Sequence, residues 1–239
     1  MRDSSADSVN VPRIRRACWI AVALLAQFLV GVAAAISAYP GRYSLTTQYL
    51  SELGCRQGDE RLHALIFNGS LILAGIGLCY LFGTLIRETM RGPIELLVLS
   101  GSGMGAGVAV VFIGLLPFNA FPRSHNLAML AWLTLMLPML AAWMEWMEWT
   151  GRRAPSTGAA MALGRSMRIL IFLFPIAACL SLGPGLQKVI VLACIIWLLV
   201  FCFQIQRAAT AGRIRPGFPG DRKRVVFDEI TPGTYDGFH

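Results

Sequence analysis

The chain has 239 residues, of which 56% are hydrophobic and only 14% are charged, and it carries a formal net charge of +8. A soluble domain has about 25% charged residues, so this composition excludes a water-soluble globular enzyme. The same apolar content excludes a disordered chain, because disorder requires low hydrophobicity. We therefore expect an all-α, polytopic membrane protein.

Six segments are long and apolar enough to cross a bilayer, which needs roughly 20 helical residues for about 30 Å of hydrocarbon. None alternates with the period of two that is typical of a barrel strand. The first segment follows basic residues, as in a signal peptide, but its apolar run is too long for one and predicts a retained helix. The six predicted spans are Ala17–Ala38, His63–Ile86, Pro93–Pro117, Asn126–Trp149, Met167–Gly183 and Leu186–Gln206.

These spans define the domain organisation. We expect a six-helix transmembrane domain over residues 17–206, between a cytoplasmic N-terminal segment (1–16) and a cytoplasmic tail (207–239). The tail is rich in Gly, Pro and charged residues, which is typical of flexible chain.

The distribution of Lys and Arg predicts the orientation, because cytoplasmic loops carry an excess of both residues. With the N-terminus inside, the outer segments hold five of the 21 Lys and Arg residues and the inner segments hold the other 16. The outer five are Arg42, Arg56, Arg61, Arg123 and Lys188. We therefore expect both termini in the cytoplasm and a location in the cell inner (plasma) membrane. The positive charge is a topology signal, and without interleaved aromatic residues it predicts no nucleic-acid partner.

The first outer loop predicts a short amphipathic helix on the membrane surface. Ser44 is a suitable N-cap, apolar residues follow at helical spacing, and Gly54 stands where a helix would end in the left-handed conformation. The apolar residues are Leu45, Tyr49, Leu50 and Leu53. Such a helix lies with its apolar side toward the membrane and places Ser51 and Glu52 near the outer mouth of the bundle.

The third span contains a run of small residues, Ser100 to Gly107, with glycines at 101, 103, 105 and 107. Two overlapping GxxxG spacings favour close approach of a neighbouring helix, so a protein partner at this helix is one expectation. The run lacks the GK[ST] of a phosphate loop, which excludes a nucleotide role. The six cysteines show no CxxC spacing, and no cofactor or disulfide framework is predicted.

Polar residues in or near the bilayer are costly and mark functional sites. The middle of these spans is almost free of charge, whereas polar residues gather at the outer ends. His63 opens the second predicted span and His125 lies directly before the fourth, so both are expected at one level. The other polar residues expected at this outer mouth are Arg42, Glu52, Asn68, Asn119 and Arg123.

Four short motifs resemble the pattern of the DUF998 membrane proteins. They are Ser51-Glu52-Leu53-Gly54, Phe67-Asn68, Gly114-Leu-Leu-Pro117 and His125. The first of them is also loosely similar to the S-[DE]-x-G element of the Frag1/DRAM/Sfk1 group. The resemblance covers roughly residues 17–206 and implies six spans with polar residues on the outer side. It implies no established activity, although Frag1-like proteins are linked to lipid remodelling and membrane stress.

The preferred hypothesis is binding of membrane lipids, or of a partner, at the outer polar residues. Arg42 and Arg123 would hold a phosphate or headgroup, because the guanidinium group binds phosphate through two parallel hydrogen bonds. Asn68 and Asn119 would complete the binding residues. A purely structural pairing of Glu52 with Arg123 is an alternative interpretation.

The second hypothesis is a lipid-modifying hydrolase or acyltransferase. His125 would be the general base and Glu52 its orienting carboxylate, with Ser51 or water as the nucleophile. A zinc variant would use His63, His125 and Glu52 as ligands. No HExxH or GxSxG element supports either form.

Two further alternatives remain open. Haem b between His63 and His125 is one, although both residues stand at helix ends. Transport is the other, although the spans lack a midplane carboxylate.

Overall fold

The computed structural model describes residues 10–56, 59–89, 94–152 and 183–211, and the regular elements in these ranges are all helices. Five of them are long and apolar enough to cross a membrane, which confirms the prediction of a multi-pass membrane protein. The predicted fifth span, Met167–Gly183, lies outside the described residues except for Gly183. The elements are α1 (Val11–Ser37), η2 (Leu50–Gly54), α2 (Leu62–Thr89), α3 (Ile94–Leu115), α4 (Pro122–Arg152) and α6 (Pro184–Thr210).

Helix α1 begins at a capped end that is also tied to α2. The side-chain oxygen of Asn10 accepts a hydrogen bond from the backbone N–H of Arg13 at 3.0 Å, and Pro12 occupies the first turn, where its missing N–H costs nothing. The Arg13 guanidinium donates to Glu88 near the end of α2 at 2.9 Å, and the Asn10 N–H donates to the other carboxylate oxygen at 3.0 Å. One carboxylate therefore fixes α1 and α2 as antiparallel neighbours.

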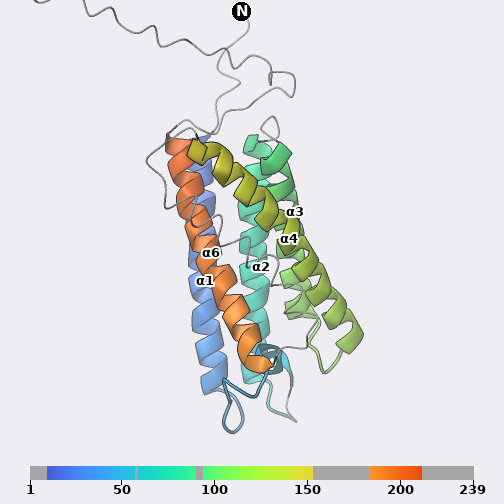
Figure 1. Cartoon of the computed structure of the whole chain (residues 1–239). Helices are drawn as coiled ribbons and strands as arrows, with labels where there is room; N and C mark the ends of the chain where they lie inside the picture. The colour runs from blue at the N-terminus through green and yellow to red at the C-terminus, as the bar shows by residue number, and fades with distance from the viewer. Residues whose placement is uncertain (1–9, 57–58, 90–93, 153–182, 212–239) are drawn as a thin grey trace, which may run out of the picture.

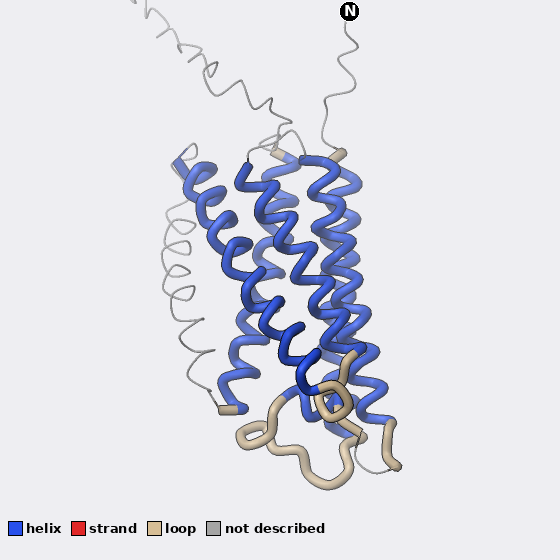
Figure 2. The backbone as a smooth tube through the Cα atoms, turned by 90° about the vertical axis from the view of Figure 1, so that its right-hand side faces the viewer, coloured by secondary structure: helices blue, strands red, loops and turns tan. Residues whose placement is uncertain are grey.

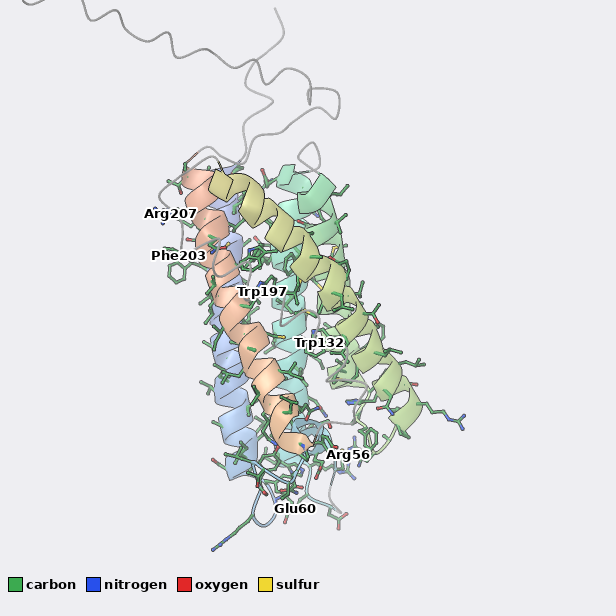
Figure 3. The ribbon with its side chains drawn as sticks, viewed as in Figure 1. Arg56, Glu60, Trp132, Trp197, Phe203 and Arg207 are labelled. Atoms are coloured by element: carbon green, nitrogen blue, oxygen red, sulfur yellow. The ribbon has the colours of Figure 1, made fainter. Side chains whose placement is uncertain are left out.

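The described helices form a row in the order α6, α1, α2, α3, α4 (Figure 1). Helix α2 packs between α1 and α3, α4 packs along α3, and α6 packs along α1. The described loops after α1 and after α3 gather with η2 at one end of the bundle, called here the η2 end (Figure 2). Trp132 of α4 and Trp197 of α6 lie between their two helices, whereas Phe203 projects away from the bundle (Figure 3). The far end of α4 returns to α6, where the Trp143 ring meets the Trp197 ring at 5.7 Å between centroids, so the five long helices surround an interior side (Figure 1).

Helices α2 and α3 approach each other closely because glycines line their contact. A Cβ atom on Gly75 would lie 2.7 Å from the carbonyl oxygen of Gly107, and one on Gly107 would lie 2.9 Å from the backbone nitrogen of Cys79. A Cβ atom on Gly103 would lie 2.6 Å from the ring of Phe82 on α2. The glycine run thus serves packing within the chain. A protein partner at α3 stays a prediction, and the exposed Gly101 is the position it would concern.

The expected amphipathic helix over residues 44–54 is wrong in length and type. The chain forms only the short 3₁₀ helix η2, and Ser44 instead closes a turn by accepting a hydrogen bond from the backbone N–H of Thr47 at 3.2 Å. The apolar residues do not share one face, because Leu45 is 60% exposed while Leu53 is fully buried. The helical spacing of the apolar residues is coincidental, because single residues anchor this segment through separate contacts.

Replacement of Gly75 by Ala should separate α2 from α3, because the new methyl group meets backbone atoms that cannot move away as a side chain could. We expect a loss of about 1–3 kcal/mol in stability, as for other overpacked contacts. Thermal unfolding of the detergent-solubilised protein measures the loss. Gly69→Ala is the matched control on the same helix, since no atom lies within 4 Å of its missing Cβ; equal effects of the two variants would contradict the packing role.

Candidate functional site

Three consecutive backbone carbonyl oxygens, those of residues 54–56, accept hydrogen bonds from side chains of other elements. The Asn68 amide on α2 donates to the first at 3.0 Å, and Nε2 of His63, also on α2, bonds the second at 2.9 Å. The Asn119 amide, in the loop between α3 and α4, donates to the third at 3.1 Å. Because a carbonyl only accepts, the His63 proton sits on Nε2. These three predicted site residues therefore hold the chain that leaves η2.

Glycine is required at position 54 by the close contact with Asn68, and not by a left-handed turn. Its φ is not positive, and among the described glycines only Gly41, at 84°, has a positive φ. A Cβ atom on Gly54 would lie 2.4 Å from the side-chain oxygen of Asn68. The expectation of a left-handed helix end is therefore wrong, and the physical reason for glycine is the close approach of α2.

His125 is buried at the start of α4 and completes the corner between α3 and α4. Its Nδ1 bonds the carbonyl oxygen of Leu116, directly after the end of α3, at 2.8 Å. The Phe118 ring packs edge-on against the imidazole, with 5.8 Å between ring centroids. The last carbonyl groups of a helix have no partner within the helix. His125 therefore binds a carbonyl oxygen left free where α3 ends.

Glu52 is engaged within its own turn. One carboxylate oxygen accepts a hydrogen bond from the backbone N–H of Tyr49 at 2.8 Å, and the other accepts from the Gln48 amide at 3.4 Å. Within the described part of the chain, no hydrogen bond or ion pair joins Glu52 to His63, His125 or Arg123, and no three His, Cys, Asp or Glu side chains could hold a metal ion together. The structure does not bring the predicted catalytic and zinc residues together as one set.

The residues that fasten residues 48–54, the lid segment, to α6 were missed by sequence reasoning. Gln187 accepts a hydrogen bond from the backbone N–H of Leu50 at 2.7 Å, and Lys188 donates to the carbonyl oxygen of Gln48. The Lys188 ammonium also lies 5.4 Å from the centroid of the Tyr43 ring. The available signal was a polar pair near the start of an otherwise apolar span, one residue after Gly183-Pro184-Gly185.

Tyr43 lies in a polar cluster with the lid segment. Its hydroxyl donates to the carbonyl oxygen of Tyr49 at 3.1 Å, and its ring packs edge-on against Tyr39 at 5.4 Å between centroids. Burial raises the pKa of Tyr43 to about 12, and the negative charge of Glu52 and the neighbouring Tyr39 add to the shift. Tyr43 therefore remains a neutral donor over the physiological range.

Arg42 and Arg123, the predicted phosphate ligands, are exposed at the η2 end. Neither side chain forms a hydrogen bond or ion pair with another described residue. They differ in this from Lys188, whose ammonium is already bonded to backbone oxygens of Gln48 and Pro184. The two arginines are thus cations that remain available to an anionic group.

An apolar cavity of about 130 Å³ lies on the interior side of the bundle, next to the lid segment. All five long helices line it with aliphatic, methionine and aromatic side chains. Leu50, Ser51 and Gln187 line it at the η2 end, and Phe82 and Trp197 line it deeper between the helices. Apart from methionine and tryptophan, the described lining residues that carry a sulfur or polar group are Ser51, Gln187 and Cys194. The cavity suits the apolar part of a membrane-soluble molecule.

Comparison with known proteins places the chain in a family without an assigned activity. The family described as protein of unknown function (DUF998) matches residues 20–204. No curated protein and no solved structure matches the chain. The looser similarity to the Frag1/DRAM/Sfk1 group stays a prediction.

Asn68→Leu should destabilise the η2 end, because it leaves the Gly54 carbonyl oxygen without its side-chain donor. Removal of one partner of a buried hydrogen bond costs about 1–3 kcal/mol. Limited proteolysis in the loop after η2, together with the thermal midpoint, measures the effect. The control is Asn126→Leu, an exposed asparagine on α4, and a loss no larger than that of the control would contradict the anchoring role.

The absorbance difference between the wild-type protein and Tyr43→Phe, followed against pH, should show a phenol that ionises near pH 12. Glu52→Gln should move this midpoint toward the ordinary value of about 10, because it removes a nearby negative charge. The folded state holds this proton more tightly than the unfolded state, so the contribution of Tyr43 to stability falls as pH rises from about 10 to 12. A midpoint near 10 in the wild-type protein would contradict the burial.

Proposed function

The chain belongs to the DUF998 family of membrane proteins of unknown function, and on that premise we propose that it binds a membrane-soluble lipid-type molecule in the cavity next to the lid segment. The observation that carries the proposal is an almost wholly apolar cavity whose η2 end is formed by the family-pattern residue Ser51. Ligand pockets are concave, mostly apolar and equipped with a few polar groups at fixed places. The cavity has this composition.

The shape of the lining supports an elongated ligand. On α6 the lining runs from Gln187 to Leu198, which is 11 residues and therefore about 17 Å at 1.5 Å per residue. About 17 Å is more than half of the hydrocarbon thickness of a bilayer. A volume of about 130 Å³ along that length favours a narrow apolar chain or one ring with a chain.

Residues 48–52 of the lid segment would supply an entrance, whereas Leu53 is fully buried and Gly54 is bonded to Asn68. The contact of the lid segment with α6 consists of the Leu50–Gln187 hydrogen bond and the Lys188 bond to the Gln48 carbonyl oxygen. Hydrogen bonds of this kind contribute about 0.5–1.5 kcal/mol each. Opening also breaks the bonds of the Gln48 amide to Tyr39 and of the Tyr43 hydroxyl to Tyr49. Leu53 and the anchors at residues 54–56 stay in place, so residues 48–52 would move as a flap.

The orientation follows the excess of Lys and Arg at the other end of the bundle. We place the η2 end outside the cell, both termini in the cytoplasm and the chain in the plasma membrane. Arg42 and Arg123 then face the outer leaflet, where their free guanidinium groups would attract a phosphate or other anionic headgroup. A hydrolase or acyltransferase is not favoured, because Glu52 bonds the Tyr49 N–H and does not orient His125.

Ala106→Leu should abolish ligand retention, because Ala106 lines the cavity and three added carbons fill much of its volume. The measurement is the amount of lipid-type molecules that co-purify with the protein, quantified by mass spectrometry after detergent exchange. Ala193→Leu, on the exposed face of α6, is the control. Equal co-purification with the two variants, at equal thermal stability, would disprove binding in the cavity.

A further inference from the structure

A groove of about 370 Å³ lies between α3 and α4, on a different face of these helices from the one that lines the cavity. None of the residues that α3 and α4 contribute to the cavity lines the groove. The groove is therefore a separate hollow, which the proposed function does not use. Its lining residues are Gly105, Val108, Ala109, Phe112 and Leu116 of α3 and Ser124, Leu127, Ala128, Ala131 and Leu135 of α4.

The groove has a floor of small buried residues and walls of large exposed ones. Ala109 and Ala128 are 6% and 9% exposed, whereas Phe112 and Leu127 are 48% and 66% exposed. Both helices are long and apolar enough to cross a membrane. Exposed apolar walls on such helices face lipid chains and not water, so the groove opens toward the bilayer.

The length of the groove matches one leaflet of the bilayer. On α4 the lining runs 11 positions from Ser124 to Leu135, which is about 17 Å at 1.5 Å per residue. Half of the hydrocarbon thickness is about 15 Å. The deep end closes where a Cβ atom on Gly105 would lie 3.0 Å from the side chain of Leu135. The groove thus runs from the η2 end to about the middle of the membrane, which is the reach of one acyl chain.

The η2 end of the groove is positively charged. Ser124 is the one polar residue among the described residues that line the groove, and Arg123 directly precedes it. Arg123 is exposed and forms no hydrogen bond or ion pair with another described residue. No Asp or Glu stands between Leu116 and Arg123 in the sequence. A guanidinium group binds phosphate through two parallel hydrogen bonds, so this end complements an anionic headgroup.

We propose that the groove binds one acyl chain of an anionic phospholipid from the leaflet at the η2 end, and that Arg123 holds the phosphate group of this lipid. A phospholipid carries its phosphate directly above its acyl chains, so one molecule makes both contacts. A lipid without net charge fills the groove equally well, but its own cationic group competes with Arg123 for the phosphate. The site is additional to the cavity of the proposed function, and Arg42 remains available to a ligand of that cavity.

The test uses the full chain in nanodiscs of dioleoyl phosphatidylcholine and dioleoyl phosphatidylglycerol in equal amounts. Native mass spectrometry of the released protein counts the bound lipids of each class. The two lipids have identical chains, so any preference between them arises from the headgroup. Lys and Arg at the other end of the bundle bind phosphatidylglycerol as well. The lipid of the groove is therefore defined as the one that a groove-filling variant loses.

Ala131→Leu fills the groove from an exposed position on α4, and it should lower the number of bound lipids by about one. The lost lipid should be phosphatidylglycerol about fivefold more often than phosphatidylcholine, the factor that one Lys or Arg near an anionic membrane surface supplies. Arg123→Gln should keep the number of lipids and remove this preference. The controls are Ala193→Leu, on the exposed face of α6, and Arg61→Gln, an exposed arginine before α2. Neither control should change the count or the ratio.

Equal lipid counts for Ala131→Leu and Ala193→Leu would overturn the site, and equal lipid ratios for Arg123→Gln and Arg61→Gln would overturn the role of Arg123. A wild-type dimer that Ala131→Leu converts to a monomer would assign the groove to a second copy of the chain instead. Ala106→Leu separates this site from the cavity. In that background Ala131→Leu should still remove the same lipid, whether or not Ala106→Leu has removed one of its own.

Discussion

The η2 end depends on one constraint: backbone carbonyl groups close to a membrane need a hydrogen-bond donor when the chain is not helical. After η2 the chain runs without regular structure, and the oxygens of residues 54–56 take their donors from Asn68, His63 and Asn119. His125 does the same for the oxygen of Leu116. An unsatisfied carbonyl in a low-dielectric environment costs several kcal/mol. The first three of these bonds position the chain at the end of the lid segment, and Gln187 and Lys188 then fasten the lid segment to α6.

The same constraint explains what the sequence could and could not predict. Helix positions follow from apolar length alone, so α1, α2, α3, α4 and α6 agree with the predicted spans to within a few residues, apart from the earlier start of α1 at Val11. The polar residues at the outer mouth were identified as a group, but the carbonyl partners of His63, Asn68, Asn119 and His125 were not predicted. The sequence does not distinguish a histidine that bonds a carbonyl oxygen from one that acts as a base. Only the partner of the imidazole separates the two roles. Gln187 and Lys188 were missed because their partners lie about 140 positions away.

The two sides of α2 are packed differently: glycines line its contact with α3, and the cavity lies on its interior side. Glycines bring α2 and α3 to backbone contact, so no side chain can be accommodated there. On the interior side large residues such as Trp132 and Trp197 line the cavity from inclined helices (Figure 3). The glycine run was read as a contact surface, and it is one, but within the chain.

The cavity has the polarity of a groove for an apolar chain. A groove for an acyl chain needs polar groups at the headgroup end and none at the other end, because the deep part of the ligand is hydrocarbon. Here Ser51 and Gln187 stand at the η2 end, and the deeper lining residues are aliphatic, aromatic or sulfur-containing. The indole nitrogen of Trp197 lies enclosed by neighbouring atoms and adds no polar surface to the cavity. The exposed Arg42 and Arg123 stand at the same end as Ser51, which argues for a ligand whose polar group stays at the η2 end while its apolar part enters between the helices.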